Sequence, residues 1–143
     1  MHILVRSVAW GLCFDVMAAL TACAPVLRTV IPDITGSITN GSAAVPNAEV
    51  TVGQGPDEVC RAPKRRVAAN ASGDFSVESL REFGAAHAGG EEITDWNLCV
   101  RVGDRIYHGI WFFGHSSKAV IHVMCDLQRK ASDRQDGVCV IKD

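Results

Sequence analysis

Short runs of strand-forming residues, separated by clusters of Gly, Asn, Asp and Pro, extend through most of this chain of 143 residues. Branched and aromatic residues favour strands, whereas the separating residues favour turns. No segment has a helical period long enough to indicate a different class. Seven short strands with frequent turns therefore predict an all-β, seven-stranded antiparallel sandwich. The expected strands are Ile34–Thr39, Glu49–Val52, Val59–Ala69, Phe75–Val77, Trp96–Val102, Arg105–Phe113 and Ala119–Leu127.

Three segments in the first half of the chain carry a further pattern. They are Thr35-Gly36-Ser37-Ile38 followed by Gly41, then Val45–Val52, then Ala71–Val77. In this order and spacing they resemble the transthyretin-like, carboxypeptidase regulatory-like domain. That family has a Gly-x-Val strand, a Pro-x-Ala-x-Val strand and a Thr/Ser-x-x-Gly-x-Phe hairpin. The resemblance spans Thr35 to Val77 and implies a Greek-key arrangement of the seven strands.

The first 22 residues differ from the rest, because 16 of them are hydrophobic. Arg6 precedes an apolar stretch, Val8–Leu20, that contains Asp15 and is too short to favour a permanent transmembrane helix. The stretch ends in Leu20-Thr21-Ala22-Cys23, which resembles the lipobox of bacterial lipoproteins. The resemblance implies a signal helix that is removed and a Cys23 that carries the lipid. The alternative is a buried N-terminal helix with an incidental Cys23.

The chain accordingly divides into four parts. Residues 1–22 are expected to be a lipoprotein signal peptide, 23–33 a tether, 34–127 the sandwich domain, and 128–143 a C-terminal tail. Within the sandwich, Ser79–Thr94 contains three glycines and is expected to be mostly loop, with one helical turn at its start.

Removal of the signal and lipidation of Cys23 would leave four cysteines in an exported chain. They are Cys60, Cys99, Cys125 and Cys139. Such a set normally forms disulfides, with three possible connectivities, and the spacings contain no Cys-x-x-Cys pair typical of a zinc site. In the expected strands Cys99 alternates with apolar residues, whereas Cys125 is in register with them, so a bridge between these two would join opposite faces. Of the connectivities that remain, we favour Cys60–Cys99 with Cys125–Cys139, and the second of these bridges would pin the tail to the last strand.

A candidate partner surface comes from the last two expected strands, which we expect to pair as a hairpin. If Ile110 faces His122, then Tyr107, Trp111 and Phe113 lie on the core face. The opposite face would carry an exposed apolar patch, which is typical of a binding surface. The candidate residues are Ile110, Phe112 and Met124, with His108 and His122 as diagonal neighbours. Two imidazoles without a carboxylate or thiolate make a poor metal site, so no metal or other cofactor is expected.

Net charge and the absence of catalytic motifs limit the classes of function that are consistent with the sequence. A net charge of -2 gives no cationic surface for nucleic acid, and no Gly-x-Ser-x-Gly nucleophile motif occurs. The sequence therefore predicts a non-catalytic binding or accessory module, held by a lipid on the periplasmic side of the outer membrane, with an unknown protein or glycan partner. One alternative is a carbohydrate-binding module that uses Phe112 and Tyr107. The other is a periplasmic inhibitor or immunity protein that acts through the loop Gly84–Thr94.

Overall fold

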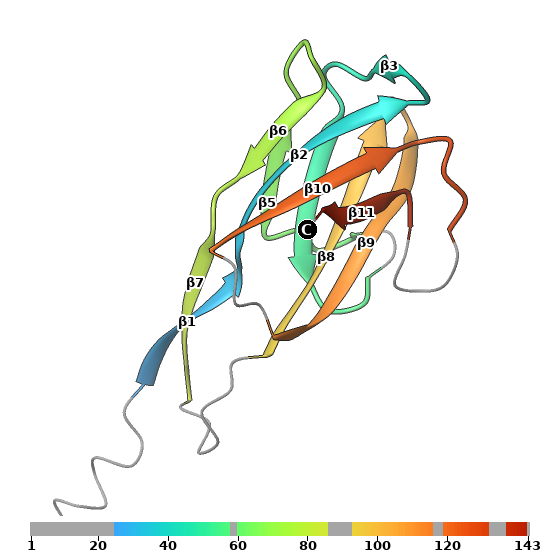
Figure 1. The fold of residues 1–143 in the computed structure, drawn as a ribbon. Helices are drawn as coiled ribbons and strands as arrows, with labels where there is room; N and C mark the ends of the chain where they lie inside the picture. Colours follow the sequence, from blue (N-terminus) through green and yellow to red (C-terminus); the bar gives the residue numbers. More distant parts are fainter. Residues whose placement is uncertain (1–24, 58–59, 86–92, 116–118, 132–136, 143) are drawn as a thin grey trace, which may run out of the picture.

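The computed structural model describes residues 25–57, 60–85, 93–115, 119–131 and 137–142, and these form eleven strands and no helix (Figure 1). The strands are β1 (Pro25–Ile31), β2 (Asp33–Asn40), β3 (Ala43–Ala44), β4 (Glu49–Gln54), β5 (Arg65–Ala68), β6 (Asp74–Val77), β7 (Leu80–Ala85), β8 (Ile93–Val102), β9 (Arg105–His115), β10 (Val120–Asp126) and β11 (Cys139–Lys142). The expected all-β class is confirmed. The expected signal peptide and Cys23 lie outside the described residues.

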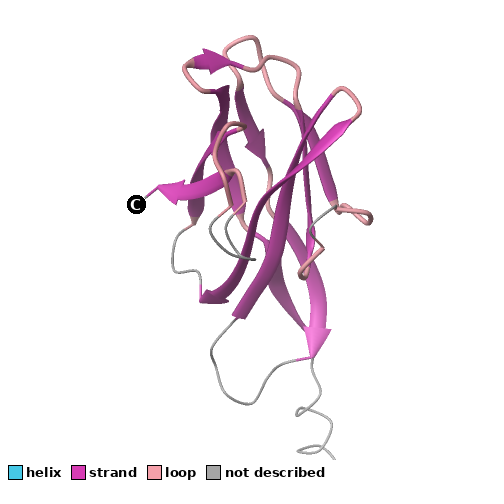
Figure 2. Ribbon diagram, turned by 90° about the vertical axis from the view of Figure 1, so that its right-hand side faces the viewer, coloured by secondary structure: helices cyan, strands magenta, loops and turns pink. Residues whose placement is uncertain are grey.

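Two sheets form the layers of a sandwich, and a two-stranded ribbon extends from one end (Figures 1 and 2). The first sheet has the order β11-β10-β2, with β3 and β6 both pairing with β2. The second sheet has the order β5-β4-β8-β9, and the ribbon is β1-β7. The pairing of β10 with β2 is parallel, whereas all other described pairings are antiparallel. The first sheet is therefore mixed, and the described strands exceed the seven expected.

The core lies between the two sheets and follows from alternation along the strands. On β10, Ile121 and Val123 are buried, while His122 between them is exposed. On the facing sheet, the fully buried Trp96 stacks on Phe112 with ring centroids 5.5 Å apart. Because each strand places every second residue inward, the apolar residues of both sheets fill one shared interior.

The hairpin expected between the last two long strands does not form. β9 pairs with β8, whereas β10 crosses to the other sheet and lies between β2 and β11. The short connection after His115 suits a hairpin and a crossing between sheets equally well. The crossing gives β10 ladder partners on both sides and buries its apolar face. His108 on β9 and His122 on β10 consequently belong to different sheets and are not neighbours.

A bulge in β9 reverses the faces expected for its aromatic residues. Leu98 pairs with Ile110 and Cys99 with His108, which leaves Gly109 as an extra residue in β9. A Cβ atom at Gly109 would lie 2.7 Å from the Leu98 Cδ2 and 2.9 Å from the Cys139 Sγ, so only glycine fits this approach. Beyond the bulge Ile110 is buried and Phe113 is exposed, the reverse of the expected arrangement.

Two segments expected to be irregular are strands. The expected tether contains β1, whose last residues Val30 and Ile31 are buried, and the expected loop after Ser79 begins with β7 instead of a helical turn. β1 and β7 pair with each other, with Leu27 opposite Phe83. The two segments are about 50 residues apart in the sequence, so the residue pattern of each one does not indicate that they pair. Conversely, the long strand expected at Val59–Ala69 is reduced to β5.

Both predicted disulfides are confirmed. Cys125 and Cys139 are directly opposite each other on β10 and β11, so their bond attaches the tail to the sheet. Cys60 and Cys99 join the loop after β4 to the middle of β8. This loop covers the outer side of β8, where the Asn97 side chain donates to the backbone carbonyl oxygens of Gln54 (3.3 Å) and Gly55 (2.6 Å).

Asp126, the last residue of β10, holds the turn between β2 and β3. Its Oδ1 accepts hydrogen bonds from the backbone N–H groups of Gly41 (2.8 Å) and Gln128 (3.0 Å), and these bonds lower the pKa of the carboxyl below its ordinary value. The folded state therefore favours the ionised form. Its contribution to stability is present above the ordinary aspartate pKa and is lost as the pH falls through the lowered value.

We accordingly expect Asp126→Asn to unfold at a lower urea concentration than the wild type at neutral pH. The difference should narrow below about pH 4, where the wild-type carboxylate begins to take up protons in the unfolded chain. Urea titrations across this pH range, followed by circular dichroism, measure the effect. Asp104→Asn in the exposed turn between β8 and β9 is the control, and an equal response of the two variants would contradict the assignment.

Candidate functional site

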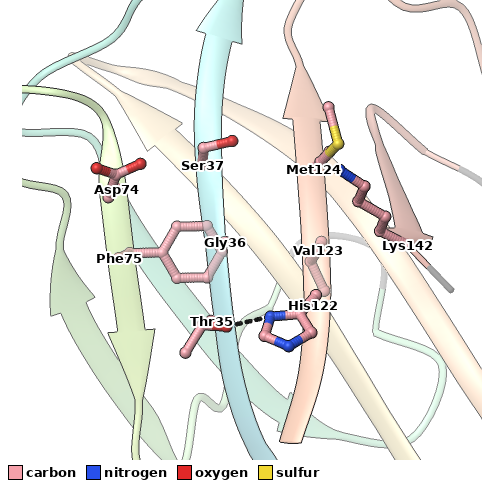
Figure 3. A pocket seen from close by; sticks show the side chains of 9 residues that line it. All are labelled: Thr35, Gly36, Ser37, Asp74, Phe75, His122, Val123, Met124 and Lys142. Carbon is pink, nitrogen blue, oxygen red and sulfur yellow. Dashed lines mark hydrogen bonds between the residues drawn. The ribbon is translucent and has the colours of Figure 1, made fainter.

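An open groove of about 710 Å³ crosses the outer face of the mixed sheet, over β6, β2, β10 and β11. Figure 3 shows side chains from all four strands around it. The lining residues are Thr35, Gly36, Ser37, Asp74, Phe75, His122, Val123, Met124 and Lys142. The groove is therefore assembled from strands that are distant in the sequence and adjacent in the sheet.

The alternation that builds the core also builds this groove. On β10, His122 and Met124 are exposed because their neighbours on either side face the core. Parallel pairing places His122 opposite Thr35 and Met124 opposite Ser37 of β2. Antiparallel pairing with β11 places Lys142 opposite His122. Each register thus adds a polar side chain to the outward face.

One hydrogen bond fixes a side chain in the groove. The Thr35 Oγ1 and the His122 Nδ1 lie 2.7 Å apart, and the dashed line in Figure 3 marks this contact. It orients the imidazole across the boundary between β2 and β10. Next to this pair, Met124 has 48% of its surface exposed.

Charges of opposite sign stand on the two sides of the groove. Asp74 on β6 lies opposite Ser37, whereas Lys142 lies on β11 beyond β10. The sheet therefore separates a carboxylate from an ammonium group by the width of β2 and β10, with hydroxyl groups, an imidazole and a thioether in between. This arrangement can accept and donate hydrogen bonds along an extended ligand. Among the described residues, no group of three or more His, Cys, Asp or Glu side chains could hold a metal ion.

The structure separates the three residues of the predicted partner surface. Ile110 is buried in the core, and Phe112 is half-buried against Trp96, whereas Met124 lies on the outer face of the other sheet. Only Met124 lines the groove. Tyr107, named with Phe112 for a carbohydrate site, packs against the core and has the Arg105 guanidinium 4.7 Å from its ring centroid. Much of the loop Gly84–Thr94 proposed for an inhibitor lies outside the described residues.

The outer face of β9 carries aromatic residues that the strict alternation missed. The Trp111 Nε1 donates to the Asp95 Oδ1 at 2.7 Å, and the Phe113 ring lies 6.4 Å from the Trp111 ring. Phe113 has 56% of its surface exposed. Gly109 within an otherwise continuous strand pattern is a signal for the bulge that turns these rings outward.

Comparisons with protein-family models, with curated proteins and with solved structures give no match. The class is therefore defined by the fold and the groove alone, as a mixed β-sandwich with two disulfides and an open groove on one outer face. Within the described part of the chain, no helix is long and apolar enough to cross a membrane.

Proposed function

We propose that the protein is a non-catalytic binding module of the bacterial cell envelope, anchored through a lipid on Cys23 and facing the periplasm from the outer membrane. The groove on the mixed sheet is its binding site. The observation that carries the proposal is the composition of that groove, which combines Asp74 and Lys142 on opposite sides with the exposed Met124 between them. Such a surface suits an extended polar partner, because it offers hydrogen bonds along its length and one apolar contact.

The openness of the groove supports binding rather than catalysis. Enzyme sites generally exclude water around the reacting atoms, so that fixed charges act in a medium of low dielectric constant. Here the hydroxyl of Thr35 and the imidazole of His122 lie on an outer sheet face. A bound segment of protein or glycan would lie across the strands with much of its surface still in water.

The transthyretin-like, carboxypeptidase regulatory-like arrangement is part of the same proposal. The three segments that carry the resemblance lie largely in β2, β4 and β6 and the turns beside them. Gly36 is crowded by the ring of Phe75, and Gly73 has a φ of 79° in the turn before β6, so both glycines occupy positions that exclude most other residues.

A capture experiment with two matched variants tests the binding site. Met124→Glu places a charge in the groove, whereas Ile106→Glu places one at a site on β9 with a similar exposed fraction, 39%. We expect detergent-solubilised envelope to yield a partner that binds the wild type and Ile106→Glu equally and binds Met124→Glu about tenfold less tightly, as the loss of one good contact implies.

The identity of the captured partner separates the alternatives. A glycan would favour the carbohydrate-binding module, and a secreted hydrolase whose activity falls on binding would favour the inhibitor. A partner that binds all three proteins equally would show that the groove is not the site. Circular dichroism of each variant confirms that the fold is intact before binding is compared.

A further inference from the structure

The ribbon of β1 and β7 is the most exposed apolar part of the described structure. Leu27 and Phe83 are opposite each other in its antiparallel pairing, and 53% and 75% of their surfaces are exposed. Figure 1 shows β1 and β7 extending together beyond the two sheets, at the end where the chain enters the fold. A two-stranded ribbon has no second layer of its own to cover such a pair.

Chain length fixes where this pair lies relative to the proposed anchor. β1 begins at Pro25, so cleavage before Cys23 leaves two residues, Cys23 and Ala24, between the lipid and the strand. Two residues span at most about 7 Å. An acylated Cys23 therefore holds the start of β1 at the surface of the bilayer, and Leu27 follows two positions after Pro25.

The charges of the ribbon suit a phospholipid surface. In the pairing of β1 with β7, Arg81 is opposite Thr29 and therefore shares the face of Leu27 and Phe83. A long cationic side chain beside apolar residues can reach phosphate groups while its neighbours contact acyl chains. The acidic Glu82 points to the other face, where its carboxylate is paired with the Lys64 Nζ at 3.0 Å.

A further exposed apolar side chain lies beside the ribbon. Residues Arg28–Val30 of β1 line a small cavity together with Ile93–Asp95 of β8, so the start of β8 is adjacent to β1. Ile93 at this point has 53% of its surface exposed. An exposed apolar side chain of the neighbouring sheet therefore lies near β1.

From these observations we infer that Leu27 and Phe83 insert into the interfacial region of the phospholipid bilayer and hold the sandwich in a fixed orientation on the membrane. The inference rests on the proposed lipid anchor. The anchor supplies attachment, whereas the ribbon supplies orientation, and the groove on the mixed sheet is then presented at a set angle to the membrane surface.

Fluorescence quenching in vesicles tests the inference. The full-length protein, purified from membranes, is reconstituted into vesicles of phosphatidylethanolamine and phosphatidylglycerol that contain brominated phospholipid, which quenches tryptophan at short range. Phe83→Trp is expected to add an emission that bromine quenches. Met124→Trp, at an exposed position on β10, is expected to add an emission that bromine leaves unchanged. The wild-type spectrum, which contains the native tryptophans, is subtracted from both.

Two further measurements distinguish the possible failures. Palmitate incorporation and flotation with the vesicles report the anchor independently of the ribbon. If the protein is anchored but bromine does not quench the emission of Phe83→Trp, the inference is wrong and the proposed function stands. The same conclusion follows if this emission changes with soluble glycans and not with lipid. A protein without palmitate that does not float overturns both.

Discussion

Replacement of Cys23 by serine is expected to abolish the incorporation of radioactive palmitate. Serine keeps the size of the side chain but lacks the thiol that receives the diacylglycerol in bacterial lipoproteins. The wild type should migrate as the processed, labelled chain, whereas Cys23→Ser should keep residues 1–22 and carry no label. The expected effect on labelling is all or none, because the variant lacks the proposed acceptor of the lipid.

The chain offers a close control for this experiment. Cys13 lies in the same apolar segment, and the described residues contain four cysteines that are all joined in disulfides. Cys13→Ser is therefore expected to be labelled and processed like the wild type. Equal labelling of Cys23→Ser and the wild type would contradict the anchor. Absence of label from both proteins would favour the alternative in which the first residues form a buried helix. Mass spectrometry of the N-terminal peptide measures cleavage and acylation together.

The disulfide pattern was predictable in part from the sequence, because side-chain parity is retained within a regular strand. Cys99 alternates with the buried Leu98 and Val100, and Cys125 shares the inward parity of Val123. This difference argues against a bridge between Cys99 and Cys125 without any knowledge of the sheet order, and it leaves two of the three connectivities. The parity rule needs only that each strand is regular near its cysteine. The pairing of β8 with β4 around Cys99 and the pairing of β10 with β2 around Cys125 are both unbroken.

The same rule failed on β9 because the strand is not regular. One extra residue at Gly109 shifts the alternation, so that Ile110 and Phe112 turn inward and Trp111 and Phe113 turn outward. Glycine is required at position 109 because the Cys139 sulfur and the Leu98 side chain occupy the space beside it. A glycine marks the position in the sequence, but the atoms that require it belong to β8 and β11.

The groove could not be predicted from the sequence, for a related reason. Thr35 and His122 are 87 positions apart, and they meet because β10 crosses to the sheet of β2. The pattern of β10 specifies which residues face outward, and Met124 was identified in this way. It does not specify which strands lie beside it, because parallel and antiparallel neighbours accept the same alternation of buried and exposed residues.

Gly36 is the position on β2 where this crossing leaves no room for a side chain. A Cβ atom there would collide with the backbone carbonyl oxygen of Val123 on β10 and would lie 2.6 Å from the Phe75 Cζ. The Phe75 ring is buried in the core and the carbonyl belongs to the central strand pair, so neither can move alone. Relief of the collision requires β2 and β10 to separate, which breaks the parallel ladder at the centre of the mixed sheet.

Gly36→Ala is therefore expected to lower the free energy of unfolding by about 3 kcal/mol or more, the upper range for overpacking. For a domain of this size the melting temperature should fall by roughly 10 °C. Gly114→Ala on β9 is the matched control, because a Cβ atom there would meet the Phe112 Cζ at 3.6 Å, an ordinary contact. Alanine at that position should be nearly neutral, since it also restricts the unfolded chain. Thermal unfolding followed by circular dichroism compares the two variants, and equal melting temperatures would show that β10 does not lie against β2 at Gly36.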